Sequence, residues 1–154
     1  MVRIVQAHTP EHFETIRRLF LQYAEGLGFD LEFQNFEQEL ESLPGDYAAP
    51  NGCLLIAEDS GNWAGCVALR GLEDDNCEMK RLYVLPQYRG LGVGKILAQA
   101  VIKEARARGY KKMRLDTVSS MKKARGLYAS LGFYIIKPYR YNPIDGASYM
   151  ELKL

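Results

Sequence analysis

The stretch that decides the fold is Gln87-Tyr88-Arg89-Gly90-Leu91-Gly92-Val93-Gly94-Lys95. Before it, Cys77–Val84 has the pattern of a strand, which Pro86 ends. After it, apolar residues recur at helical spacing as far as Arg108, and Gly109 suits the left-handed position that follows a helix. Glycines let the backbone turn tightly, and the free N–H groups at a helix start attract phosphate oxygens. The stretch therefore predicts a strand, a phosphate-binding turn and a long helix.

Two familiar phosphate loops do not fit this turn. A Walker A loop needs glycine at its first position and Ser or Thr at its last, where this chain has Arg89 and Ile96. A dinucleotide loop that begins at Gly90 would need a third glycine where Lys95 stands. The pattern that does fit is Arg-x-x-Gly-x-Gly, over Arg89–Gly94. A glycine-rich helix start that binds no ligand is the alternative.

Strand and helix patterns alternate along the whole chain. The expected strands are Val2–Gln6, Cys53–Glu58, Trp63–Leu69, Cys77–Val84, Lys112–Val118, Phe133–Lys137 and Tyr149–Leu154. The first expected helix begins at Thr9 and is ended by Gly26 and Gly28. The other expected helices are Phe33–Leu43, Gly92–Arg108 and Met121–Leu131. This order predicts one α/β domain with a mixed sheet over residues 1–154.

Three segments in this order resemble the GNAT superfamily of N-acetyltransferases. Arg89–Gly94 matches its coenzyme A pyrophosphate loop, Cys77–Val84 resembles its fourth strand, and Ala124–Phe133 resembles its Leu-Tyr-x-x-Leu-Gly-Phe segment. The resemblance is close over Leu54–Phe133. It implies a single-domain GNAT-like fold, with a mixed, mostly antiparallel sheet flanked by helices and splayed between strands 4 and 5.

The resemblance also implies acetyl-CoA as co-substrate. Its pantetheine arm would pair with the backbone around Leu82 and Val84, and its pyrophosphate would bind backbone N–H groups of the glycine turn. The implied coenzyme-binding residues are Leu82, Tyr83, Val84, Arg89, Gly90, Leu91, Gly92, Val93, Gly94 and Lys95. Lys122, Lys123 and Arg125 either meet the adenosine phosphates or form a basic exposed helix face. Met121 stands where many relatives carry an Asn that contacts the coenzyme.

An N-acetyltransferase must supply a neutral amine and a proton for the departing thiolate. By the resemblance, Glu78 would be the general base and Tyr128 the general acid. Strand alternation would put Glu78 on the same face as Leu82 and Val84. The alternatives are a surface carboxylate or an ion-pair partner of Lys80 for Glu78, and a core tyrosine for Tyr128.

The distribution of charge bears on the acceptor. Leu19–Leu69 contains acidic residues but no Lys or Arg, whereas basic residues dominate Lys80–Arg125. Either these are two solvated faces, or the second half holds a polyanion and the first admits a cation. We expect a cationic primary amine as acceptor, with Phe29–Asp46 and the aromatic segment Pro138–Pro143 as candidate walls of its pocket. Packing of a final hairpin is the alternative for the second segment.

Composition excludes several other classes. The net charge of +1 argues against a protein that binds nucleic acid. No run approaches the ~20 apolar residues of a membrane span, and His8 and His12 have no metal-ligand partners at suitable spacing. Three cysteines without CxxC spacing fit buried thiols in the cytoplasm. We therefore expect a cytoplasmic, metal-free enzyme that acetylates a small molecule, amino acid, peptide or protein. An acyl-CoA sensor without turnover and a scaffold or homodimerising domain are the alternatives.

Overall fold

The computed structural model describes residues 1–27, 30–118, 121–144 and 146–154. The strands are β1 Val2–Gln6, β2 Cys53–Asp59, β3 Asn62–Gly71, β4 Asn76–Val84, β5 Lys112–Thr117, β6 Tyr134–Ile136 and β7 Ser148–Lys153. The α-helices are α1 Pro10–Leu27, α2 Phe36–Ser42, α3 Val93–Ala107 and α4 Lys122–Ser130. Short 3-10 turns lie at η1 Glu32–Gln34, η2 Gly45–Tyr47 and η3 Pro86–Tyr88. The predicted order of strands and α-helices is confirmed.

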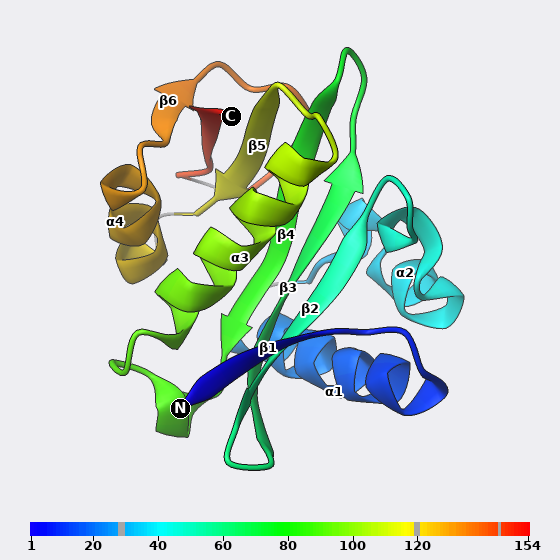
Figure 1. Ribbon diagram of the computed structural model, residues 1–154. Helices are drawn as coiled ribbons and strands as arrows, with labels where there is room; N and C mark the ends of the chain where they lie inside the picture. The colour runs from blue at the N-terminus through cyan, green and yellow to red at the C-terminus, as the bar shows by residue number, and fades with distance from the viewer. Residues whose placement is uncertain (28–29, 119–120, 145) are drawn as a thin grey trace.

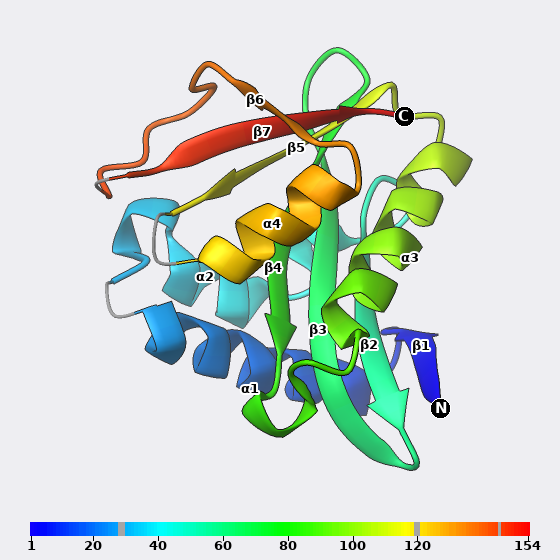
Figure 2. The same cartoon turned by 90° about the vertical axis from the view of Figure 1, so that its left-hand side faces the viewer.

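The strands form one sheet in the order β1-β2-β3-β4-β5-β7-β6. Every neighbouring pair is antiparallel except β4 and β5, which run parallel. That parallel pair joins only Asn76–Glu78 to Lys112–Arg114, after which the two strands separate (Figure 2). The predicted mixed, mostly antiparallel sheet with a splay between strands 4 and 5 is therefore confirmed.

Helices cover both faces of this sheet, with α3 and α4 on one face and α1 and α2 on the other (Figures 1 and 2). Each face has its own hydrophobic core, because successive side chains of a strand point to opposite sides. Leu55 of β2 packs under α3, whereas its neighbours Leu54 and Ile56 pack under α1. Burial on both faces explains why β2 is apolar almost throughout.

The first helix begins as predicted and ends between the two glycines that were expected to end it. Thr9 caps it, since the N–H of His12 donates to Thr9 Oγ1 at 3.1 Å. Gly26 lies inside the helix, which ends at the next residue, Leu27. Leu27 packs against the α1 core, and this contact outweighs the low helix propensity of the glycine. Gly28 lies outside the described residues.

The three cysteines are buried and make no disulfide with one another, as predicted. Burial raises the pKa of each thiol, which therefore stays protonated at neutral pH. Within the described ranges, no helix combines the length and the apolar character that a membrane span requires.

Candidate active site

A bulge in β4 shapes the cleft where β4 and β5 separate. The pairing of β3 with β4 passes from Cys66 opposite Tyr83 directly to Ala68 opposite Lys80. Two residues of β4, Arg81 and Leu82, therefore stand opposite Val67 alone. Arg81 has a φ of 61°, the left-handed conformation that turns the strand at this point.

The bulge reverses the faces of the strand beyond it. Met79 packs in the hydrophobic core between the sheet and α3, and Leu82 and Val84 pack against the same core. In a regular strand, residues three or five positions from Met79 would point to the opposite face. Glu78 therefore lies on the opposite face from Leu82 and Val84. The prediction that these side chains share one face is wrong, because simple alternation does not survive an inserted residue.

The glycine turn has the geometry of an anion site. Gly90 and Gly92 have φ values of 81° and 83°, and a Cβ on either would meet no atom within 4 Å. Glycine is thus required by the backbone conformation. The first hydrogen bond of α3 is donated by the N–H of Ile96 to the Gly92 carbonyl at 3.1 Å. In the described part of the chain, the N–H groups of Gly90, Leu91, Gly92, Val93, Gly94 and Lys95 have no hydrogen-bond acceptor.

Arg89 is engaged differently from the other residues of the turn. Its N–H donates to the Pro86 carbonyl at 3.3 Å, and its Nε donates to the Val84 carbonyl at 3.0 Å. Its guanidinium also lies 5.7 Å from the ring centre of Tyr83. Arg89 therefore fastens the turn to the end of β4, and its backbone N–H is less available to a phosphate than those that follow. A coenzyme contact at Arg89 or Val84 stays a prediction.

The edge of β4 that faces β5 is unpaired from Met79 to Val84 in the described structure. Leu82, Tyr83 and Val84 are half-buried, so their backbone lies near the surface. An unpaired strand edge can hydrogen-bond an extended amide-containing ligand as a further strand would. This edge leads directly to the free N–H groups of the turn.

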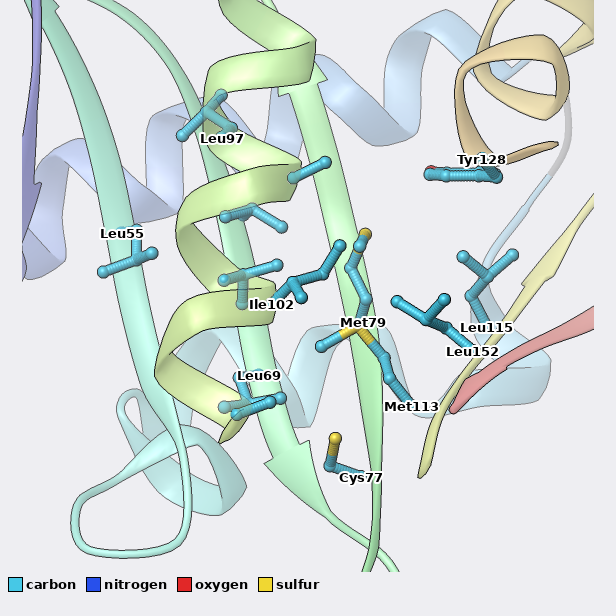
Figure 3. Packing of buried hydrophobic residues seen from close by; sticks show 14 of the residues in the cluster. Leu55, Leu69, Cys77, Met79, Leu97, Ile102, Met113, Leu115, Tyr128 and Leu152 are labelled. Carbon is cyan, nitrogen blue, oxygen red and sulfur yellow. The ribbon is translucent and has the colours of Figure 1, made fainter. Parts of the chain in front are cut away.

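Tyr128 of α4 lines the cleft between β4 and β5. Figure 3 shows it reaching from α4 toward β4, near Leu115 of β5. Its ring centre is 5.7 Å from that of Phe133, and the side chain is 6% exposed. Burial raises the pKa of Tyr128 above its usual value, so its hydroxyl stays protonated at neutral pH. That hydroxyl makes no hydrogen bond to any described residue and can donate to a ligand.

Glu78 lies in a buried network away from the cleft lining. Its carboxylate is 0% exposed and accepts hydrogen bonds from Arg70 Nε at 2.8 Å, from the Tyr139 hydroxyl at 2.6 Å and from Arg140. Burial alone would raise the pKa of Glu78, but the charges of Lys80, Arg140 and Arg70 hold it below its usual value. Glu78 is thus an ion-pair residue, but its partners are Arg70 and Arg140 and not Lys80 as the alternative had it. A role as general base stays a prediction, and these contacts favour a structural role.

The cleft contains polar groups that the sequence did not single out. Its lining comprises Tyr23, Leu27, Leu31, Gln34, Met79, Lys80, Arg81, Leu82, Leu115, Asp116, Thr117, Val118, Met121, Tyr128 and Asn142. Of its charged side chains, Lys80 and Asp116 make no salt bridge to a described residue, whereas Arg81 does. Their position depends on the bulge and the splay, and neither leaves a signal in the sequence pattern. Asn142 belongs to the segment that was expected to wall the acceptor pocket.

The acidic first half of the chain is partly neutralised by arginines. Glu39 of α2 holds Arg81 through two hydrogen bonds of 2.9 and 3.0 Å, and Asp46 lies 3.5 Å from Arg70. Phe29, at the start of the expected acceptor segment, lies outside the described residues. On α4, Lys122 and Lys123 are exposed, which fits either interpretation of that basic face. Among the described side chains, no group of three or more His, Cys, Asp and Glu is arranged to hold a metal ion.

Comparison with known sequences identifies relatives of the whole chain. The sequence profile of the acetyltransferase (GNAT) family matches residues 13–133. An uncharacterised N-acetyltransferase of Schizosaccharomyces pombe is 37% identical over 99% of this chain and 95% of its own length. N-acetylaspartate synthetase of Xenopus tropicalis is 33% identical over 68% of this chain, a match that spans 39% of the synthetase.

Solved structures show the same fold at lower identity. A GNAT-family acetyltransferase of Staphylococcus aureus superposes with a TM-score of 0.82 at 21% identity, covering 99% of both chains. The PaiA N-acetyltransferase of Thermoplasma acidophilum, solved in complex with coenzyme A, has a TM-score of 0.76 at 18% identity. That match covers 100% of this chain and 99% of the other.

Proposed function

Because the chain belongs to the GNAT family of acetyltransferases, we propose that it transfers the acetyl group of acetyl-CoA directly to a primary amine. The observation that carries this proposal is the row of free N–H groups from Gly90 to Lys95, placed beside the open edge of β4. A coenzyme A complex of the similarly folded PaiA N-acetyltransferase supports the choice of donor.

The residues of the turn fit a pyrophosphate. Gly90 and Gly92 leave open space where a Cβ would stand, so phosphate oxygens can approach the backbone closely. The N–H groups of the first turn of α3, together with the helix dipole, favour a negative charge there. The backbone of Leu82 and Tyr83 at the β4 edge would hold the pantetheine arm and direct it toward the cleft.

The cleft residues supply proton transfer and positioning. Bound acetyl-CoA supplies an activated thioester, so the protein has to orient an amine and manage two protons. As the amine nitrogen bonds to the acetyl carbon, the carbon–sulfur bond breaks, and Tyr128 donates its hydroxyl proton to the thiolate. The amine gives up its own proton, to Glu78 through water or to solvent. Because an alkyl ammonium has a pKa of about 10.4, that step costs about 4–5 kcal/mol at pH 7.

The proposed reaction leaves several classes of amine as possible acceptors. The expected cationic amine includes small molecules, amino acids and the amines of peptides or proteins. The name of N-acetylaspartate synthetase, a relative over part of the chain, supports testing amino acids among them. The buried thiols support a reducing compartment, so we place the reaction in the cytoplasm.

Two measurements test this function. Isothermal titration with acetyl-CoA should show binding, and no binding at about 100 μM would remove both the enzyme and the coenzyme-sensor proposals. A panel of amines, followed by release of free thiol, should then show turnover. Binding without turnover on any amine would favour the sensor.

The variant Tyr128→Phe tests the role of the acid. It should lower turnover by about 10²–10⁴-fold while leaving coenzyme affinity nearly unchanged. Tyr141→Phe is the matched control, since Tyr141 is 76% exposed and does not line the cleft. Equal turnover in Tyr128→Phe and wild type would remove Tyr128 from the mechanism.

A further inference from the structure

Two opposite charges face the cleft from the two separated strands. Lys80 belongs to β4 and Asp116 to β5. In the described structure each has only a neutral amide as side-chain partner. Lys80 Nζ donates to Gln34 Oε1 at 3.0 Å, and Asp116 Oδ2 accepts from Asn142 Nδ2 at 3.0 Å. Neither is within salt-bridge distance of an opposite charge among the described residues.

Lys80 differs in this respect from the other charged residues of β4. Arg81 is paired with Glu39, and Glu78 is paired with Arg70 and Arg140. Lys80 is only 7% exposed, and a buried ammonium that makes no direct ion pair is costly for the protein. An anionic group on the ligand would remove that cost.

A third polar group marks the same place. The hydroxyl oxygen of Thr117 is fully covered and has no hydrogen-bond partner in the described structure, although Thr117 lines the cleft. Buried hydroxyls are normally hydrogen-bonded, because an unsatisfied one costs free energy. Lys80 and Asp116 thus line one cleft with Tyr128, the proposed acid, and the covered hydroxyl of Thr117 lies next to Asp116 in the chain.

We propose that the acceptor carries a carboxylate as well as its amine, as an α-amino acid does, with Lys80 binding the carboxylate and Asp116 attracting the amine. The proposal rests on the proposed function and narrows its acceptor class. The cleft is small, about 40 Å³, which suits the compact amine and carboxylate of such an acceptor. Lys80 and Asp116 then determine specificity, and Tyr128 serves the chemistry for any amine.

Matched acceptors test the proposal. L-Leucine, L-leucinamide and 3-methylbutylamine share a side chain, as do L-lysine, L-lysinamide and cadaverine. We expect kcat/KM for each amino acid to exceed that of its amide and of its decarboxylated amine by about tenfold or more, since a hydrogen-bonded charge is lost in both analogues. Equal values within each set would overturn the proposal.

The variant Lys80→Met tests the residue. It should lower kcat/KM for the amino acids about 10- to 100-fold more than for the decarboxylated amines, mainly through KM. Lys111→Met is the control, because Lys111 is 75% exposed and is not among the residues that line the cleft. Asp116→Asn should lower kcat/KM for both kinds of acceptor, with Asp75→Asn as its exposed control. An equal loss for all acceptors in Lys80→Met would make Lys80 a general proton-transfer residue and refute the carboxylate role.

Binding measurements separate this proposal from the proposed function. Wild type and Lys80→Met, each saturated with coenzyme A, are titrated with L-leucine and 3-methylbutylamine in a calorimeter. Wild type should bind the amino acid more tightly and Lys80→Met should lose that preference, whether or not turnover occurs. Turnover of amines without any carboxylate preference would leave the acetyltransferase proposal standing and remove this one.

Discussion

Replacing Glu78 with Gln separates a structural carboxylate from a catalytic base. Glu78 is 0% exposed, while the side chains of Arg70 and Arg140 are 25% and 19% exposed. Removing one partner of a buried ion pair costs about 3–5 kcal/mol, because it leaves the other charge buried alone. Here water reaches both arginines, and Gln keeps an acceptor oxygen. We therefore expect Glu78→Gln to lower the free energy of unfolding by about 2–4 kcal/mol.

This loss should appear as a fall in Tm of roughly 5–15 °C, because about 1 kcal/mol shifts Tm by 2–4 °C in a chain of this size. Glu73→Gln is the control, since Glu73 is 72% exposed, lies 3.9 Å from Arg114 and should matter by less than about 0.5 kcal/mol. The assay is thermal unfolding together with kcat/KM, measured well below the lowest Tm.

The two roles predict different kinetics. If Glu78 is structural, kcat/KM of the folded variant falls by less than about tenfold, whereas loss of a general base costs about 10²–10⁴-fold. The reasoning about the buried network is refuted if Tm stays within 1–2 °C of wild type, roughly the scatter of a surface change. If Glu78→Gln kept the wild-type Tm but lost about a hundredfold in turnover, Glu78 would be the base instead.

Three further predictions concern stability and coenzyme binding. Burial, and then the charge of Arg81, lower the pKa of Lys80 to about 7, so the unfolded chain binds more protons above that pH and wild-type stability should rise from pH 7 toward pH 10. Lys80→Met should lack this rise. The difference in free energy of unfolding between Lys80→Met and wild type, measured with urea between pH 7 and 9, should therefore change by up to about 1.4 kcal/mol per pH unit. A difference that stays constant with pH would contradict the lowered pKa. Gly92→Ala should lose about 1–2 kcal/mol of stability and bind coenzyme A more weakly by calorimetry, because Gly92 has a φ of 83°, whereas Gly126→Ala within α4 should bind it normally. Arg81→Met should destabilise the fold by about 3–5 kcal/mol in the same urea assay, since it leaves Glu39 without its partner, and a neutral result would show that the pair contributes nothing.

Local sequence patterns were sufficient for most of the fold. Alternation and helical spacing predicted each strand and α-helix to within a few residues, because short-range periodicity directly reflects which face is buried. The glycine turn was predicted for the same kind of reason, since the left-handed positions of Gly90 and Gly92 are a local backbone requirement. The end of α1 at Leu27 falls between Gly26 and Gly28, the two glycines expected to end it.

The sequence by itself therefore determined the strand, turn and helix that would seat a coenzyme, and it placed Tyr128 near them. Only the tertiary structure decided which side chains meet in the cleft. An inserted residue at Arg81 put Leu82 and Val84 on the face opposite Glu78 and Lys80. Glu78 then lies in a buried ion-pair network, and Lys80 lines the cleft with Asp116. The physical reason is that a bulge and a splay are set by long-range pairing between strands, and neither has a local period in the chain.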